Sequence, residues 1–445
     1  MKTICFYFQI HQPFRLKRYR FFDIGSDHYY YDDFSNEDVI RRISERAFLR
    51  ANAIILEMIK EHNNKFKVAF SISGVALEQM EVYVPEVIDS FKELVKTGCV
   101  EFLSETYAHS LASMFDPDEF ESQVKAHSNK IELLFGQKPK VFRNTELIYF
   151  DEIGDLVSKM GYKAMIAEGA KHVLGWKSPN YLYNSAVNPK LILLLRNFKF
   201  SDDISFRFSN YDWSEYPLVA DKFVNWINAL PEEEQLINVF MNYEALGSLQ
   251  PAETGIFEFF KAIPKYAFDK KIGFSTPSEI INKLKPVASV AVPYPSSWAG
   301  EEKDMNPWNG NVLQKEALQK LYEISERVRL CQDRRILQDW IYLQASDHFH
   351  FMSTKTFPGP SAFSPYESAY DAFNNYMNVL SDFKARVAAQ FPSNIDNEEL
   401  NSLLTTIRNQ GIEIEILQKK LALKAEKQKK AKELTEKSIK SLQEK

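Results

Sequence analysis

TICFYFQ, residues 3–9, is a run of β-branched and aromatic residues that continues directly into Ile10, His11, Gln12 and Pro13. A run of this length and composition predicts a buried strand. Further runs of the same kind follow at FKVAFSI (66–72), CVEFLS (99–104), KVFR (140–143), KAMIA (163–167), LILLLRN (191–197) and LINVFMN (236–242). Seven such runs in succession decide the fold class of the first part of the chain.

Amphipathic stretches with helical spacing separate most of these predicted strands, at residues 44–61, 85–97, 119–134, 151–160 and 221–230. Strands that alternate with helices indicate an α/β fold with a parallel sheet. Seven units suit a closed or nearly closed barrel better than a doubly wound sheet. We therefore predict a distorted (β/α)7 barrel over residues 1–290.

The predicted strands end in carboxylates, histidines and polar turns. The chemistry of a (β/α) barrel sits at the carboxyl ends of its strands, so these groups should share one mouth. The carboxylates are Glu105, Glu146, Asp203 and Glu244, and the histidines are His11 and His109. Such a set is suited to acid and base chemistry on a hydroxyl-rich substrate.

Composition is typical of a large soluble enzyme. The net charge of −5 gives no attraction to nucleic acid or to an anionic membrane. Cys5, Cys99 and Cys331 lack metal-type spacing and are expected to be buried free thiols in a reducing compartment.

Polar residues from Gln9 onward interrupt the first apolar run, so we interpret it as a strand and not as a signal peptide. No stretch approaches the roughly 18 apolar residues of a membrane span, and we expect a cytoplasmic protein.

Turn-forming residues at 286–300 mark the end of the predicted barrel. Helical patterns at 314–329, 333–344 and 367–390 predict an α-helical domain over residues 291–392 that packs on the barrel and completes its cleft. Residues 393–445 are expected to form a C-terminal helix or coiled-coil tail. Its apolar residues have roughly heptad spacing and are Leu400, Leu403, Ile407, Ile414, Leu417 and Leu421. This helix either holds a homo-oligomer together or docks on its own barrel, and both alternatives remain open.

Five short motifs occur in a fixed order: His11-Gln12-Pro13, Ser73-Gly74-Val75, Phe142-Arg143-Asn144-Thr145-Glu146, Ser201-Asp202-Asp203-Ile204 and Ala345-Ser346-Asp347-His348. In these motifs the chain resembles glycoside hydrolase family 57, especially its α-amylases, from residue 1 to about residue 390. The resemblance implies a (β/α)7 barrel followed by a helical bundle. It also implies a retaining hydrolase that acts on starch- or glycogen-like α-1,4-glucans or on maltooligosaccharides.

The resemblance also implies roles for individual residues. The catalytic nucleophile falls on Glu146, and the general acid/base falls on Asp203 in preference to Asp202. His11 corresponds to a residue of the glucose-binding site. Many members carry a second histidine two positions earlier, where this chain has Gln9, whose amide can bond a sugar hydroxyl but cannot carry a proton.

Retention requires an ionised nucleophile and a protonated acid on opposite sides of the scissile bond, about 5–5.5 Å apart. Arg143, three residues before Glu146, is expected to keep the nucleophile ionised. Asp203 would need a raised pKa, which its apolar neighbours and the charge of Glu146 would supply. After Glu146 is glycosylated its charge disappears, and Asp203 becomes the base for the incoming water.

Further substrate contacts are expected around the mouth, at Gln9, His11, Glu105, His109, Arg143, Tyr243, Glu244, Asp347 and His348. Trp176 and Trp298, like Trp213 and Trp308, lie in predicted loops, where an indole can form a stacking surface for a sugar. Each of these residues also has a simpler explanation. A carboxylate at a strand end can cap a helix, and a buried histidine can be a satisfied core residue.

Several functions remain open from the residues alone. A 4-α-glucanotransferase would start with the same glycosyl-enzyme on Glu146 and differ in whether water or a sugar hydroxyl attacks it. A metal-dependent polysaccharide deacetylase would need a close pair of histidines with an aspartate, and His109 has no such neighbour in sequence. A non-catalytic glucan-binding protein is the third alternative. No GxGxxG follows the first strand and no GxxxxGK[ST] occurs, so we expect no organic cofactor. We assign no metal ligands, and a bound calcium ion remains an open alternative.

Overall fold

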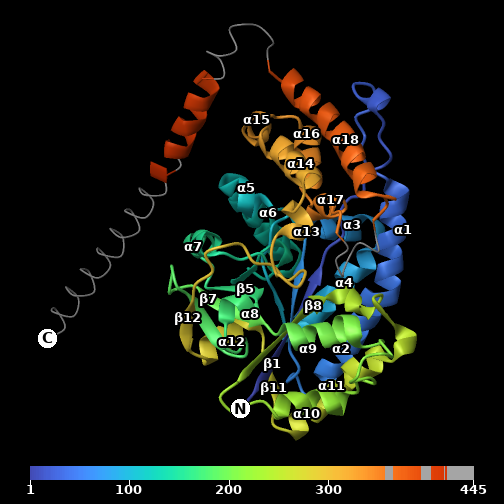
Figure 1. The fold of residues 1–445 in the computed structure, drawn as a ribbon, viewed down its shortest axis with the longest axis vertical. Helices are drawn as coiled ribbons and strands as arrows, with labels where there is room; N and C mark the ends of the chain where they lie inside the picture. The colour runs from blue at the N-terminus through green and yellow to red at the C-terminus, as the bar shows by residue number, and fades with distance from the viewer. Residues whose placement is uncertain (356–363, 392–401, 415, 418–445) are drawn as a thin grey trace, which may run out of the picture. The chain divides into compact units, whose positions relative to one another are not determined.

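The computed structural model describes residues 1–355, 364–391, 402–414 and 416–417. Within these residues, parallel strands corresponding to the predicted runs form a (β/α)7 barrel (Figure 1). The barrel strands are β1 (Thr3–Ile10), β2 (Val68–Ile72), β3 (Val100–Phe102), β4 (Val141–Arg143), β5 (Ala164–Glu168), β7 (Ile192–Arg196) and β8 (Leu236–Asn242). The prediction of the barrel is confirmed.

The barrel closes in the spatial order β8, β1, β2, β3, β4, β5, β7. Two junctions rest on one or two backbone hydrogen bonds instead of full ladders. Between β3 and β4, the N–H of Ser104 donates to the carbonyl of Val141 at 3.0 Å, and the N–H of Arg143 donates to the carbonyl of Ser104 at 2.8 Å. Between β7 and β8, the N–H of Asn197 donates to the carbonyl of Asn238 at 2.9 Å. These junctions complete the circle and direct the strand ends toward one mouth.

Helices surround the barrel, and the alternation of side chains along β1 shows why. Ile4, Phe6 and Phe8 point outward into the large apolar layer beneath the helices, while Cys5 and Tyr7 point inward into a smaller core inside the barrel. Successive side chains of a strand face opposite sides, so a strand buried on both faces is apolar throughout. The covering helices are α2 (Leu49–Glu61), α4 (Pro85–Lys96), α6 (Pro117–Phe135), α7 (Asp151–Lys159), α10 (Ala220–Asn228) and α11 (Ile256–Asp269).

Shorter elements connect the main ones. The helices are α1 (Asp33–Ile43), α3 (Gly74–Tyr83), α5 (Ala112–Phe115), α8 (Lys171–Leu174), α9 (Phe198–Asp202) and α12 (Pro277–Lys283), with π-helical turns η2 (Ser44–Phe48) and η4 (Asp203–Arg207). The strands are β6 (Leu182–Ser185), which pairs antiparallel with β7, and β9 (Leu246–Gly247), β10 (Gln250–Pro251), β11 (Gly273–Phe274) and β12 (Ala288–Val290).

A helical segment follows the barrel, with α13 (Asn306–Asn309), α14 (Val312–Tyr322), α15 (Ser325–Leu330), α16 (Arg334–Leu343), α17 (Ser346–His350) and α18 (Ala369–Ala389). Two predicted boundaries are wrong. The stretch 314–329 forms two helices, and residues 346–350 form the separate short helix α17 instead of the end of α16. Barrel and helices up to Lys384 form one compact unit, Met1–Lys384. The division into domains at residue 290 therefore remains a prediction.

The second unit, Ala385–Lys445, is described by itself. Its residues 402–414 and 416–417 are helical. The predicted apolar seam is solvent-exposed there, with Leu403 at 59%, Ile407 at 57%, Ile414 at 55% and Leu417 at 50%. Leu400 and Leu421 lie outside the described residues. Among the helices that the structure describes, none combines the length and the apolar character that crossing a membrane requires.

Candidate active site

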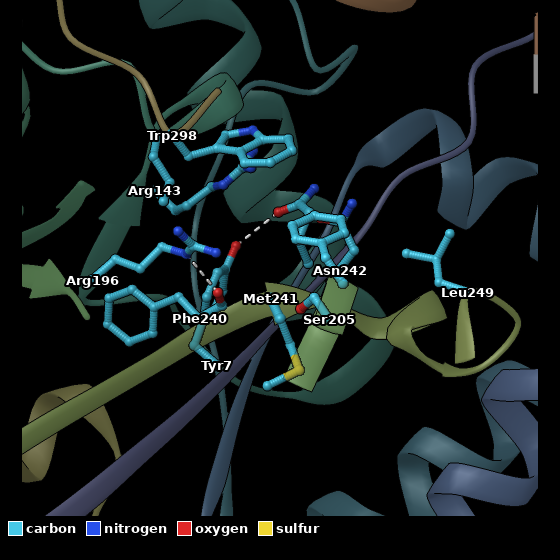
Figure 2. A pocket seen from close by; sticks show the side chains of 12 residues that line it. Tyr7, Arg143, Arg196, Ser205, Phe240, Met241, Asn242, Leu249 and Trp298 are labelled. Carbon is cyan, nitrogen blue, oxygen red and sulfur yellow. Dashed lines mark hydrogen bonds between the residues drawn. The ribbon is translucent and has the colours of Figure 1, made fainter. Parts of the chain in front are cut away.

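A cleft at the carboxyl ends of the barrel strands consists of two adjoining hollows that share Gln9, Arg143, Asn242 and Leu249. One hollow is mainly polar and is lined by His11, Gln12, Arg15, His109, Glu146, Glu244 and Asp347. Figure 2 shows the other, more apolar hollow, lined among others by Tyr7, Arg196, Phe240, Met241 and Trp298. The shared residues lie along the floor between them. The cleft therefore presents a charged wall and an aromatic wall to one space.

Glu146 is held from two sides in this cleft. Nε2 of His109 lies 3.0 Å from its Oε1, and the indole N–H of Trp298 donates to its Oε2. Burial alone would raise the pKa of Glu146. The hydrogen bond and charge of His109, the charge of Arg143 and the bond from Trp298 outweigh burial and place the pKa below its ordinary value. Glu146 is thus ionised and aimed into the cleft, as a nucleophile must be.

The backbone places both partners in an uncommon conformation. Glu146 has φ 54° and His109 has φ 55°, which is the left-handed region that side chains other than glycine rarely adopt. Such positions persist where the surrounding structure determines them, and they concentrate at functional sites. Glu146 lies in a short 3₁₀ turn directly after β4, and the turn lifts its side chain off the strand end into the cleft.

Glu105 anchors His109 from below. Oε2 of Glu105 lies 2.8 Å from Nδ1 of His109, and Ser71 also donates to Glu105. Although burial raises its pKa, the bond and charge of His109 and the charge of Arg143 hold the pKa of Glu105 at about 2. Burial lowers the pKa of His109, but its bonds to Glu105 and Glu146 raise it overall. Both ring nitrogens thus face carboxylates, an arrangement that the imidazolium form satisfies.

His11 belongs to a second, stacked pair. Its ring lies 4.2 Å from that of His109 with an interplanar angle of 20°. Nδ1 of His11 lies 2.7 Å from the Ser73 hydroxyl, and Nε2 lies 2.7 Å from Oδ2 of Asp347 on α17. Burial and the neighbouring charge of His109 lower the pKa of His11. The first, second and fifth sequence motifs therefore meet at one place in the cleft.

Arg196 joins the aromatic wall to two carboxylates. Its guanidinium lies 6.0 Å from the ring centroid of Trp298, 3.2 Å from Oε2 of Glu168 and in hydrogen-bond contact with Oδ1 of Asp202. Burial raises the pKa of Glu168 to about 7 despite the charge of Arg196. A continuous chain of contacts thus runs from Glu146 through Trp298 and Arg196 to Asp202.

Asp203 lines neither hollow of this cleft, and its sequence-based role as the general acid/base stays a prediction. Asp202 does not line either hollow, but it contacts Arg196, which lines the apolar hollow. Asp203 accepts from Nε of Arg207 at 2.6 Å and lines a separate depression. Burial raises the pKa of Asp203, as expected for a general acid. A general acid must also contact the reacting bond, so the position of Asp203 matters as much as its pKa.

Glu244 lines the polar hollow together with Glu146. Its carboxyl is 6% exposed and accepts from Nε2 of Gln12 at 3.4 Å. Burial raises the pKa of Glu244 to about 7. Gln9 and Arg143 also line the cleft, as expected. Gln9 accepts from the Tyr7 hydroxyl at 2.7 Å, and this bond fixes its amide beside Glu105.

Four expected substrate contacts lie elsewhere. Tyr243 is fully buried in the outer core and donates to Asn52 at 2.6 Å, so no substrate reaches it. His348 is 3% exposed and faces the backbone of α16. Trp176 is 93% exposed and lines neither hollow. Glu105 is fully buried below His109 and acts on the cleft only through that residue.

The sequence analysis missed several cleft residues, chiefly Arg196, Arg15 and Phe351. An arginine near the end of the otherwise apolar run LILLLRN was an available signal for Arg196, because a charge inside a barrel needs a buried partner. Arg15 and Phe351 carry no such signal, since the cleft acquires them through loop geometry. Among the described residues, no group of three or more histidine, cysteine or carboxylate side chains is arranged to hold a metal ion.

Comparison with known proteins agrees with this geometry. The family model described as glycosyl hydrolase family 57 matches residues 5–293. A Methanocaldococcus jannaschii protein named "Putative alpha-amylase" is 38% identical over 401 residues, 86% of this chain and 84% of that protein. The α-amylase of Pyrococcus horikoshii is 26% identical over 326 residues, which are 67% of this chain and 47% of that longer protein. A branching enzyme from Thermococcus kodakaraensis shares the fold, with a TM-score of 0.64 and 13% identity over 87% of this chain and 90% of that chain.

Proposed function

This chain belongs to glycosyl hydrolase family 57 and is a glycoside hydrolase, and on that premise we propose that it cleaves α-1,4-glucosidic bonds with retention of configuration. The proposed substrates are starch- or glycogen-like glucans and maltooligosaccharides, the substrate class of an α-amylase. The observation that carries the proposal is the ionised Glu146, held by His109 and Trp298 in a cleft with further carboxyl groups.

Glu146 is proposed as the nucleophile. Its two oxygens are fixed by separate donors, so its orientation is set before substrate arrives. Arg143 and the imidazolium of His109 stabilise the negative charge that the attack requires. The indole of Trp298 forms part of the same wall and offers an apolar face to a sugar ring.

Asp202 is proposed as the general acid/base in place of Asp203. It follows β7 and contacts Arg196, which lines the cleft. The guanidinium of Arg196 forms ion pairs with both Asp202 and Glu168, so one positive charge is shared by two carboxyl groups. The side chain of Asp202 is 19% exposed, which leaves its carboxyl accessible to a substrate oxygen.

The proposed reaction takes two steps. In the first, Glu146 forms a bond to the anomeric carbon, the bond from that carbon to the leaving oxygen breaks, and Asp202 gives its proton to that oxygen. In the second, water forms a bond to the anomeric carbon while Asp202 takes its proton, and Glu146 leaves as a carboxylate. Glycosylation of Glu146 removes a negative charge from the cleft before the second step begins.

A 4-α-glucanotransferase remains the second candidate, because a sugar hydroxyl can replace water in the second step. Arg15 and Phe351 border the polar hollow and line the region where an acceptor sugar would enter. The two candidates give different products from one defined substrate, so product lengths separate them.

The decisive experiment is chromatography of the products formed from maltoheptaose by wild type and by the variants Glu146→Gln, Asp202→Asn and Asp203→Asn. We expect shorter products from wild type and a loss of roughly 10⁴-fold in kcat for Glu146→Gln. Asp202→Asn should lose a similar factor, while Asp203→Asn is the matched control one residue away and should keep most activity. Products longer than the substrate would indicate the transferase.

Two further results would redirect the proposal. If Asp203→Asn is inactive and Asp202→Asn is active, the acid/base lies on the aspartate chosen from sequence. If Glu146→Gln keeps full activity, the proposed nucleophile is wrong. Azide rescue of Glu146→Ala that yields the β-glycosyl azide, with inverted configuration, would identify the nucleophile independently of rate.

A further inference from the structure

A second depression lies outside the cleft, between α9, the turn η4 and the end of α10. Its lining includes Lys199, Asp203, Arg207, Trp213 and Trp226. Its volume of about 540 Å³ falls within the roughly 300–1,000 Å³ typical of ligand sites. It shares no lining residue with either hollow of the cleft. We call it the Trp213–Trp226 pocket.

Two indoles form the apolar wall of this pocket. The rings of Trp213 and Trp226 lie 6.3 Å apart at an interplanar angle of 73°, and both are partly exposed. The guanidinium of Arg207 lies 5.8 Å from the ring centroid of Trp213, and Nζ of Lys222 lies 5.3 Å from that of Trp226. Perpendicular indoles bordered by cations give a ligand an apolar face and charged donors together.

Asp203 supplies an unused acceptor. Its side chain is 1% exposed, its Oδ1 accepts from Arg207, and its Oδ2 has no hydrogen-bond partner among the described residues. A buried carboxylate oxygen without a donor is destabilising, so a ligand that donates to it gains from that contact. A small adjustment of the Arg207 side chain would let a hydroxyl donor in the pocket satisfy this oxygen.

Charge and shape together select the ligand class. Lys199 and Arg207 disfavour a purely cationic ligand, and the carboxylates of Asp203 and Glu215 disfavour a purely anionic one. A neutral molecule with many hydroxyls satisfies both signs, and its C–H face can lie on an indole. We propose that the Trp213–Trp226 pocket is a second, non-catalytic saccharide-binding site. That the saccharide is an α-glucan rests on the proposed function; that the ligand is a neutral sugar rests on the pocket alone.

The test uses the six tryptophans of the full chain as reporters. The protein carrying Glu146→Gln is labelled with ¹⁵N-tryptophan, and its indole N–H resonances are assigned with single Trp→Phe variants. Maltotriose is then titrated. The pocket predicts saturable shifts at Trp213 and Trp226 with their own dissociation constant, separate from any shift at Trp298, which reports on the cleft.

Two variants sharpen the result. Asp203→Asn should weaken binding at the pocket by roughly tenfold, because a charged acceptor is lost, and should leave any response of Trp298 unchanged. Arg207→Gln is the second variant; it removes the guanidinium and should also weaken binding at the pocket. Shifts confined to Trp298, shifts at no tryptophan, or shifts at Trp213 and Trp226 with inorganic phosphate but not with maltotriose would each overturn the site. Shifts at Trp213 and Trp226 in a wild-type protein without glucan turnover would uphold the site and reject the proposed function.

Discussion

Nε2 of His109 lies 3.0 Å from Oε1 of Glu146, and both residues hold a left-handed backbone conformation, with φ 55° and 54°. Because the backbone of each residue is held in this uncommon conformation and their side chains are in contact, the position of the Glu146 carboxylate is fixed by more than the end of its strand. Glu105, below His109, fixes the other nitrogen of the ring. The carboxylate of Glu146 is therefore oriented by a chain of three side chains before any substrate is present.

Replacing His109 should change how activity depends on pH. His109 lowers the pKa of Glu146, so His109→Asn should raise that pKa and move the acidic limb of kcat/KM to higher pH by about one unit. The measurement is a pH profile with maltoheptaose. The exposed His172→Asn is the matched control and should leave the profile in place. A profile of reduced height with an unmoved acidic limb would contradict this role.

Glu105 should make stability depend on acidity. Its pKa in the folded protein is about 2, below the ordinary value of 4.5. Its contribution is therefore fully present above pH 4.5 and is lost as the pH falls toward 2. Over that range the free energy of unfolding of the wild type should fall by roughly 3 kcal/mol more than that of Glu105→Gln.

Urea unfolding at pH 3 and pH 6 tests this dependence. The exposed Glu301→Gln serves as control and should follow the wild type. Equal losses in the wild type and in Glu105→Gln would show that the charge of Glu105 is not stabilised by its neighbours.

Glu244 should report on substrate binding near neutral pH. Burial raises its pKa to about 7, so its carboxyl is protonated below that pH and can donate to a sugar hydroxyl. As the pH rises through 7 the donor is lost, and KM should increase several-fold. Glu244→Gln keeps a donor at every pH and should give a KM that is flat across this range. The comparison requires initial rates between pH 5.5 and 8.5, and an identical rise in KM in the variant would exclude this assignment.

Gly74 should be intolerant of even a methyl group. A Cβ at Gly74 would lie 2.5 Å from the ring of Tyr107, whose hydroxyl donates to Glu78 at 2.5 Å. Gly74→Ala must displace that ring and should cost about 1–3 kcal/mol in urea unfolding. The control is Gly411→Ala, a helical position with nothing within 4 Å, where alanine should not destabilise. Equal stability of the two variants would show that Tyr107 moves freely.

The tail should determine the oligomeric state if its apolar residues form a seam. Leu403, Ile407 and Ile414 are more than half exposed on helical residues 402–414. Removing residues 396–445 should convert an oligomer to a monomer, as measured by size-exclusion chromatography with light scattering. Replacing the three residues with glutamine in the full chain is the matched variant. An unchanged mass in both would place the interface elsewhere or show a monomer.

Much of the fold follows from local pattern, because a strand buried on both faces must be apolar and each run ended where polar groups began. The motif residues at strand ends were therefore predictable, and Gln9, His11, His109, Arg143 and Glu146 all line the cleft. The orientation of an individual side chain could not be predicted from the sequence. Asp202 and Asp203 are neighbours of identical chemistry, and only the structure shows that Asp202 contacts Arg196 while Asp203 contacts Arg207.

The same reasoning explains the misplaced Tyr243 and His348. Both follow residues that do line the cleft, Asn242 and Asp347, and a sequence shows no difference between adjacent polar positions. Residues contributed by distant loops, such as Phe351, depend on how the helical segment packs. Local periodicity contains no information about that packing.

The bond between His11 on β1 and Asp347 on α17 joins residues that are 336 positions apart. A ribosome delivers the first residue almost at once and the second only after most of the chain has been made. Until α17 emerges, His11 has no carboxylate partner and the charged wall of the cleft is incomplete. The charged wall of the cleft is therefore completed late in synthesis, once α17 can pack against the end of β1.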